Sequence, residues 1–194
     1  MHRLSLLLLP ALVVALSACD SDGDDAVGAD RTATADVSAP DDTTTGVTGT
    51  VDLRQDGDEL VMDLDISGLS PNSAHGFHIH CDGDCGVADF DDDGTAEAAG
   101  AAGPHYDPLG TDDHGAPTAP LGEKHAGDFG NVTADAQGRV ETTITTRDVS
   151  LEGTRPVEGR AVMVHANRDD LETDPGGNAG DRIGCGVISD AEAG

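Results

Sequence analysis

The residues of this chain best suited to chemistry are histidines and one aspartate, which lie in short separate motifs. The motifs are FHIH, GPHYDP, DDHGAP, KHAGD and MVHA, and the residues are His78, His80, His105, His114, His125, Asp128 and His165. Seven nitrogen and oxygen ligands are more than one metal ion uses, so we predict two neighbouring metal ions. Imidazole ligands suit copper and zinc. The sequence therefore predicts a redox metalloprotein.

Short runs rich in β-branched residues must position these ligands, with Gly, Asp, Pro and Asn between them. The runs cover 33–38, 47–54, 60–66, 76–81, 140–146, 160–165 and 184–189. Residues 60–66 alternate between apolar and polar side chains, which is typical of a half-buried strand. No helical stripe of about ten residues occurs after residue 30. We expect an antiparallel sandwich or barrel with two long functional loops, roughly 81–125 and 166–182.

Strand geometry gives the histidines near residue 80 different roles. Side chains alternate along a strand, so His78 and His80 share one face and form a two-nitrogen clamp. Phe77 and Ile79 then anchor the strand in the core behind them. His75 falls on the opposite face, and we expect it to satisfy core polar groups or to fix a loop.

The charge balance is strongly acidic, with 10 Lys and Arg against 38 Asp and Glu and a formal net charge of −28. Such a surface repels nucleic acid and anionic lipid headgroups, so neither is an expected partner. An acid-rich composition fits either a disordered chain or a folded protein solvated for high salt. The β alternation favours the folded protein.

The N-terminus is typical of an export signal. Residues 1–18 combine a short cationic start with an apolar run too short to span a bilayer comfortably. LSAC at 16–19 resembles a bacterial lipobox, which predicts cleavage before Cys19 and lipidation of its thiol; the alternative is an ordinary signal with an incidental cysteine. Residues 19–30 then form an acidic flexible tether, and 31–194 form the domain. We expect a periplasmic or cell-surface lipoprotein of a bacterium.

Three cysteines remain beyond Cys19, namely Cys81, Cys85 and Cys185. An odd number in an exported protein allows one disulfide and one free thiol. A bond from Cys85 to Cys185 would close a long loop, and a bond from Cys81 to Cys85 is also compatible with the spacing.

The motifs GFHIH, AAGPHYDP, HGAP, KHAGDFGNVTAD, GRAVMVH and GGNAGDRIGCGVI resemble the copper–zinc superoxide dismutase family from about residue 31 to 190. The resemblance implies an eight-stranded Greek-key β-barrel. It also implies disproportionation of superoxide to dioxygen and hydrogen peroxide by a cycling copper ion, with structural zinc. The alternative is a copper- or zinc-binding lipoprotein without dismutase activity. Monomer and homodimer both stay open.

The resemblance also implies roles for individual residues. The implied copper ligands are His78, His80, His105 and His165, and the implied zinc ligands are His105, His114, His125 and Asp128. His105 would bridge both metals and carry a proton. Asp169 would link a copper histidine to a zinc histidine, and Arg182 would attract superoxide at the channel mouth. The implied disulfide joins Cys85 to Cys185 and leaves Cys81 as a free or buried thiol.

Two features depart from the family pattern. The loop that carries Arg182 is acidic and has no lysine, which predicts that salt raises the activity. An insertion follows Cys85 and contains Asp89, Asp91 and Asp93 in the pattern D-x-D-x-D-G, the first half of a calcium loop. Gly100 stands where that loop needs a glutamate, so the alternative is a solvated acidic insertion.

Overall fold

A computed structural model describes residues 31–40, 45–90 and 93–190 of this chain. Within them the chain forms nine strands and one short 3₁₀ helix. The elements are β1 (Thr32–Ser38), β2 (Thr48–Asp56), β3 (Glu59–Ser67), β4 (Ala74–His80), η1 (Gly100–Ala102), β5 (Asp128–Thr133), β6 (Val140–Thr146), β7 (Ala161–His165), β8 (Arg182–Val187) and β9 (Ser189–Asp190).

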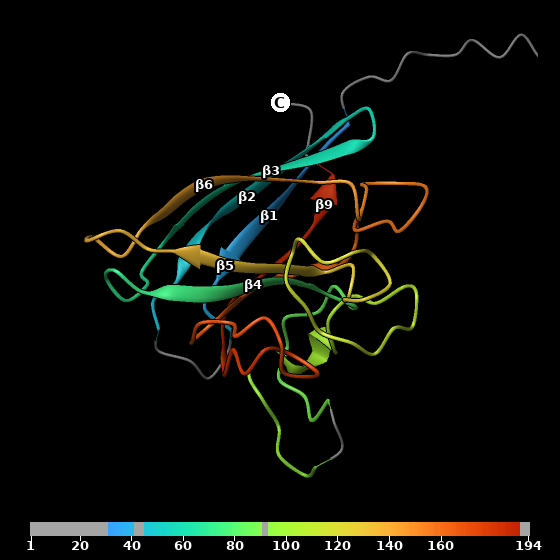
Figure 1. Ribbon diagram of the computed structural model, residues 1–194. Helices are drawn as coiled ribbons and strands as arrows, with labels where there is room; N and C mark the ends of the chain where they lie inside the picture. The colour runs from blue at the N-terminus through green and yellow to red at the C-terminus, as the bar shows by residue number, and fades with distance from the viewer. Residues whose placement is uncertain (1–30, 41–44, 91–92, 191–194) are drawn as a thin grey trace, which may run out of the picture.

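One antiparallel sheet contains all of these strands, in the order β5-β4-β7-β8-β1-β2-β3-β6, with β9 paired to β1. The sheet curls into a nearly closed barrel (Figure 1). Residues 81–127 follow the end of β4, whereas residues 166–181 follow β7 and begin beside the start of β4, because β4 and β7 run antiparallel. The predicted all-β fold with eight principal strands is confirmed. The two-residue β9 is an addition to it.

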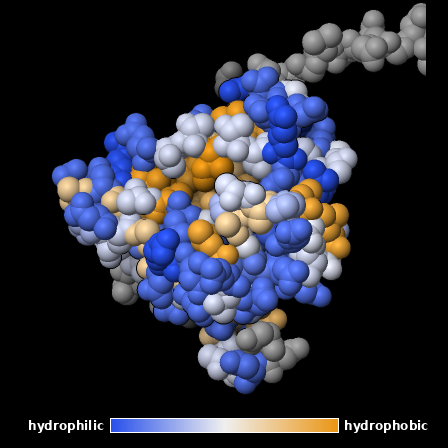
Figure 2. Space-filling model, in the orientation of Figure 1, coloured by the Kyte–Doolittle hydropathy of each residue, from blue (hydrophilic) through white to orange (hydrophobic). Residues whose placement is uncertain are grey.

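Alternation of apolar and polar residues builds the core. In β3, Leu60, Met62, Leu64 and Ile66 are at most 2% exposed, while the intervening aspartates face solvent. Antiparallel pairing with β2 places Leu53 opposite Met62, so both strands turn the same face inward. Because aromatic residues are few, aliphatic side chains supply most of the buried volume. Hydrophilic residues cover much of the visible outer face (Figure 2), as the acidic composition predicts.

Strand β5 is the element that sequence patterning missed. Its sequence, DFGNVT, contains few β-branched residues, and Gly130 has a positive φ of 72°. The pairing of β5 with β4 also shifts register between Gly76 and His78. The prediction of two long loops is confirmed, since residues 81–127 join β4 to β5 and residues 166–181 join β7 to β8.

Two sequence predictions fall outside the described residues. These are the export signal at 1–18 and the lipidated Cys19 with its tether. Among the residues that the structure does describe, no helix is long and apolar enough to cross a membrane.

Candidate metal centre

Two buried groups of potential metal ligands meet at one imidazole. The first ligand set is His78, His80, His105 and His165, and the second ligand set is His105, His114, His125 and Asp128. In each set the ligand atoms lie within 4.8 Å of one another. The sheet brings them together because β4 carries two of the histidines beside β7, which ends at His165. The structure therefore assembles all seven residues that the sequence singled out.

Backbone carbonyls orient two imidazoles of the first ligand set. Nδ1 of His80 lies 2.8 Å from the carbonyl oxygen of Gly103, and Nδ1 of His165 lies 3.0 Å from that of Gly180. Donating Nδ1–H to a carbonyl leaves Nε2 as the lone-pair nitrogen in each ring. The two Nε2 atoms are 3.4 Å apart. The metal-ligating nitrogens of both histidines therefore point toward the same position in the first ligand set.

Asp169 connects the two ligand sets. Its Oδ2 lies 2.8 Å from Nε2 of His78, and its Oδ1 lies 2.9 Å from Nε2 of His114. Nδ1 of His78 is buried and has no hydrogen-bond partner among the described residues, while the buried Nδ1 of His114 lies 3.2 Å from Oδ2 of Asp128 without hydrogen-bond geometry. Buried polar atoms without partners are costly. Metal ions bound at these two nitrogens would satisfy them, so the residues fit the metals that the sequence predicts.

Asp128 organises the second ligand set. Its Oδ1 lies 2.8 Å from Nδ1 of His105 and 3.3 Å from Nδ1 of His125, and its Oδ2 lies 3.2 Å from Nδ1 of His114. The backbone N–H groups of Gly115 and His125 each donate to Oδ2 at 3.1 Å. Three nitrogens and one carboxylate oxygen match the donors that a closed zinc site uses.

Burial keeps the first ligand set neutral and ready to bind metal. It lowers the pKa values of His78, His80 and His165, and burial with the nearby His78 lowers the pKa of His105 to about 3. His114 behaves differently. Burial lowers its pKa, but the nearby carboxylates of Asp128 and Asp169 outweigh that effect and raise the pKa to about 9. A metal ion at His114 therefore takes the place of a proton.

Two residues that we did not predict support Asp169. The side chain of Asn131 donates to the Asp169 carbonyl at 2.9 Å and accepts the Asp169 N–H at 2.8 Å. Gly177 has a φ of 63°, and a Cβ there would lie 2.0 Å from Asp169 Oδ1 and 2.6 Å from His114 Nε2. Both residues lie inside motifs noted in the sequence, but their function depends on contacts between distant loops.

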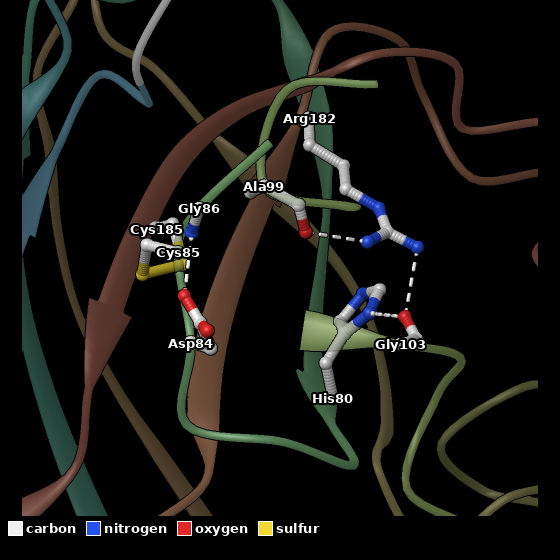
Figure 3. The surroundings of a disulfide bond; sticks show 8 residues. All are labelled: His80, Asp84, Cys85, Gly86, Ala99, Gly103, Arg182 and Cys185. Atoms are coloured by element: carbon white, nitrogen blue, oxygen red, sulfur yellow. Dashed lines mark hydrogen bonds between the residues drawn. A yellow bond between two sulfur atoms is a disulfide. The ribbon is translucent and has the colours of Figure 1, made fainter. Parts of the chain in front are cut away.

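Arg182, the first residue of β8, lies at the wall of a cavity of about 730 Å³. His80, His105 and His165 also line this cavity. Arg182 is 8% exposed, and its guanidinium donates to the carbonyl oxygens of Ala99 at 2.7 Å and Gly103 at 2.8 Å. Figure 3 shows that Gly103 accepts from both Arg182 and His80. One carbonyl thus fixes the cation relative to a predicted metal ligand.

The remaining cysteines and His75 have structural contacts. The structure joins Cys85 to Cys185 by a disulfide, as the resemblance implied, and Cys81 is free (Figure 3 shows the disulfide). The Cys81 thiol donates to the backbone carbonyl of His105 at 3.4 Å, and burial raises its pKa. His75 contacts the carbonyl oxygen of His165 at 2.8 Å, which fits the loop-fixing role predicted for it.

The inserted acidic segment caps its own turn. Oδ2 of Asp89 accepts the N–H of Gly94 at 2.9 Å, and Oδ1 of Asp93 accepts the N–H of Thr95 at 2.7 Å. Asp91, the middle residue of the calcium-like pattern, lies outside the described residues.

Comparison with known proteins identifies the family. The family model described as copper/zinc superoxide dismutase (SODC) matches residues 47–188. The chain is 42% identical over 150 residues to a superoxide dismutase (Cu-Zn) of Neurospora crassa, covering 73% of this chain and 89% of that protein. It is 39% identical over 152 residues to a superoxide dismutase (Cu-Zn) of Paramecium bursaria Chlorella virus 1, covering 75% and 74%. The chain therefore belongs to the copper/zinc superoxide dismutase family.

Proposed function

We propose that the first ligand set binds copper and the second ligand set binds zinc, for the disproportionation of superoxide. The main support for this assignment is the position of the His105 imidazole, which both ligand sets share. Nδ1 of His105 faces Asp128 at 2.8 Å, which leaves Nε2 for the first ligand set. The first set consists of four nitrogens, and three of its histidines line the cavity, whereas the second includes a carboxylate and resembles a closed structural site.

The net reaction converts two superoxide ions and two protons to one dioxygen and one hydrogen peroxide. When bound, copper supplies the one-electron chemistry, because it changes oxidation state readily and zinc does not. With copper bound, Nε2 of His105 would hold a proton in one half of the cycle and release it in the other, since imidazole can act as both base and acid. Arg182 attracts the anion to the cavity and orients it beside His80 and His165.

Superoxide consumption by the metal-loaded protein tests this assignment. We expect rapid consumption by the natural sequence and a loss of about tenfold or more in kcat/KM for Arg182→Ala, since electrostatic steering is worth roughly 10–10³ in rate. Arg147→Ala serves as the control, because this exposed arginine is on the surface and pairs with Glu59. A copper- or zinc-binding protein without dismutase activity would bind both metals and consume no superoxide, and that result would reject the proposal.

We expect activity to rise as salt increases from low concentration. Glu97, Asp174 and Asp181 line the same cavity as Arg182, and the whole chain has a formal net charge of −28. This field repels superoxide when the Debye length is long, and the length falls from about 10 Å at 0.1 M to about 3 Å at 1 M. Stopped-flow rates across that range measure the effect. A rate that falls steadily with salt contradicts the prediction.

We also propose that the protein is exported and anchored to a membrane through lipidated Cys19. The apolar leader and the LSAC motif support this proposal, and the acidic residues 20–30 would hold the domain away from anionic headgroups. In a bacterial host, Cys19→Ala is expected to move the protein from the membrane fraction to the soluble fraction. Fractionation with immunoblotting measures the shift, with Cys81→Ala as the matched control. Equal membrane retention of both variants would rule the anchor out.

A further inference from the structure

The insertion after Cys85 folds back on itself to form part of the cavity wall. Ala88 and Glu97 pair through two backbone hydrogen bonds of 3.2 and 2.9 Å, and the N–H of Ala101 donates to the carbonyl of Gly86 at 3.0 Å. The start of the segment is tied to β8 by the Cys85–Cys185 disulfide. Its end is tied to the same strand by the hydrogen bond from Arg182 to Ala99. Both ends of the segment are thus held against β8.

Phe90 lies on this segment and covers the substrate-attracting cation. Its ring centroid is 4.3 Å from Cζ of Arg182, within the range of a cation–π contact. Phe90 lines the same cavity as His80 and His165, and 38% of its surface is exposed. An exposed aromatic residue in a chain with 2% aromatic content requires an explanation, and the core does not use this ring.

We propose that Phe90 is a positioning and specificity-determining residue, whose ring holds the Arg182 guanidinium and narrows the cavity to small anions. The inference rests on the proposed function only in identifying superoxide as the favoured anion. Two carbonyl oxygens fix the guanidinium through its Nη atoms, and the aromatic ring restrains it from its face. These contacts restrain the cation in different directions.

The ring favours a diatomic anion over a larger one for two reasons. It occupies space at the cavity wall next to the cation, so a tetrahedral oxyanion has less room there than superoxide. It also displaces water from the guanidinium face, which strengthens the attraction between Arg182 and an anion in the cavity. A small anion keeps access to Arg182 while a bulky one loses it.

Phenylglyoxal modification of the metal-loaded protein tests the positioning role without relying on dismutase activity. This reagent reacts with guanidinium groups, and mass spectrometry of the peptide that contains Arg182 gives the rate at that residue. We expect Phe90→Ala to accelerate modification of Arg182 about twofold to fivefold, the range that corresponds to an exposed cation–π contact. Phe90→Tyr, which keeps the ring, should restore the natural rate.

Val87→Ala is the matched control, because Val87 lies on the same segment, is 39% exposed and does not line the cavity. In the natural protein and this control we expect inhibition by azide to be much stronger than by phosphate. Phe90→Ala should reduce the ratio of the phosphate inhibition constant to the azide inhibition constant by about threefold or more. The azide inhibition constant should change less than the phosphate one. Equal Arg182 modification rates in Phe90→Ala and Val87→Ala would overturn the proposal. If the natural protein consumed no superoxide, the proposed function would be wrong. The Arg182 modification rates would still test the role of Phe90.

Discussion

Replacing Asp169 by asparagine is expected to weaken metal binding at both sites by about 10–100-fold, the usual effect of losing a carboxylate behind a ligating histidine. Asp169 accepts hydrogen bonds from Nε2 of both His78 and His114, and it is fully buried. These bonds place the proton on Nε2 and leave Nδ1 free for the metal. An asparagine amide offers one acceptor oxygen and one donor nitrogen. At least one histidine then faces an N–H donor that favours a proton on Nδ1, the metal-ligating atom.

Competition titrations of Cu²⁺ and Zn²⁺ into the metal-free protein measure this effect. Glu172→Gln is the matched control, since it removes the same charge from an exposed residue on the same loop. We expect the control to bind both metals as the natural sequence does. If Asp169→Asn and Glu172→Gln bind both metals with equal affinity, then the carboxylate does not set the histidine tautomers.

Removing the disulfide is expected to cost the domain about 2–5 kcal/mol of stability. The bond joins residues separated by 100 positions, and closing a loop of that length is worth about 4.7 kcal/mol in the chain-entropy description. Cys185 lies beside Met163 in a small buried cluster, so the loss is not compensated by hydration of that thiol. For a domain of this size, we expect Cys85→Ala to lower the melting temperature by roughly 10 °C.

Thermal and urea unfolding of the metal-free protein measure the disulfide effect separately from metal binding. Cys81→Ala is the control, because Cys81 is half-buried and forms no disulfide. We expect this change to cost less than about 1 kcal/mol. Losses of the same size in both variants would show that cysteine packing, and not the cross-link, accounts for the stability.

The sequence predicted the strands whose side chains alternate. Leu60 to Ile66 follow the two-residue period of a half-buried strand, and the structure places that segment in β3. The sequence failed at β5, because DFGNVT lacks this period and Gly130 interrupts the pairing. That strand forms through its pairing with β4. The local sequence preference of residues 128–133 does not by itself specify this edge strand.

The ligand types were readable from the sequence because few other residues bind copper and zinc as histidine does, and their number required two metals. Their partition into two sets came from family resemblance, and the structure supplies its physical basis in the position of His105 between Asp128 and the cavity. Spacing along the chain cannot give that position, since these residues come from separate loops and strands.

By itself, the sequence determined the β-rich domain, the histidine and aspartate ligands and the acidic charge, because composition and residue period are local properties. Family resemblance implied that Asp169 joins a copper histidine to a zinc histidine, and the structure shows these contacts with His78 and His114. Only the tertiary structure decided that Gly177 must lack a side chain there and that Phe90 covers Arg182. These contacts link segments far apart in the chain. Their geometry exists only once the barrel has closed and both long loops have packed against β4.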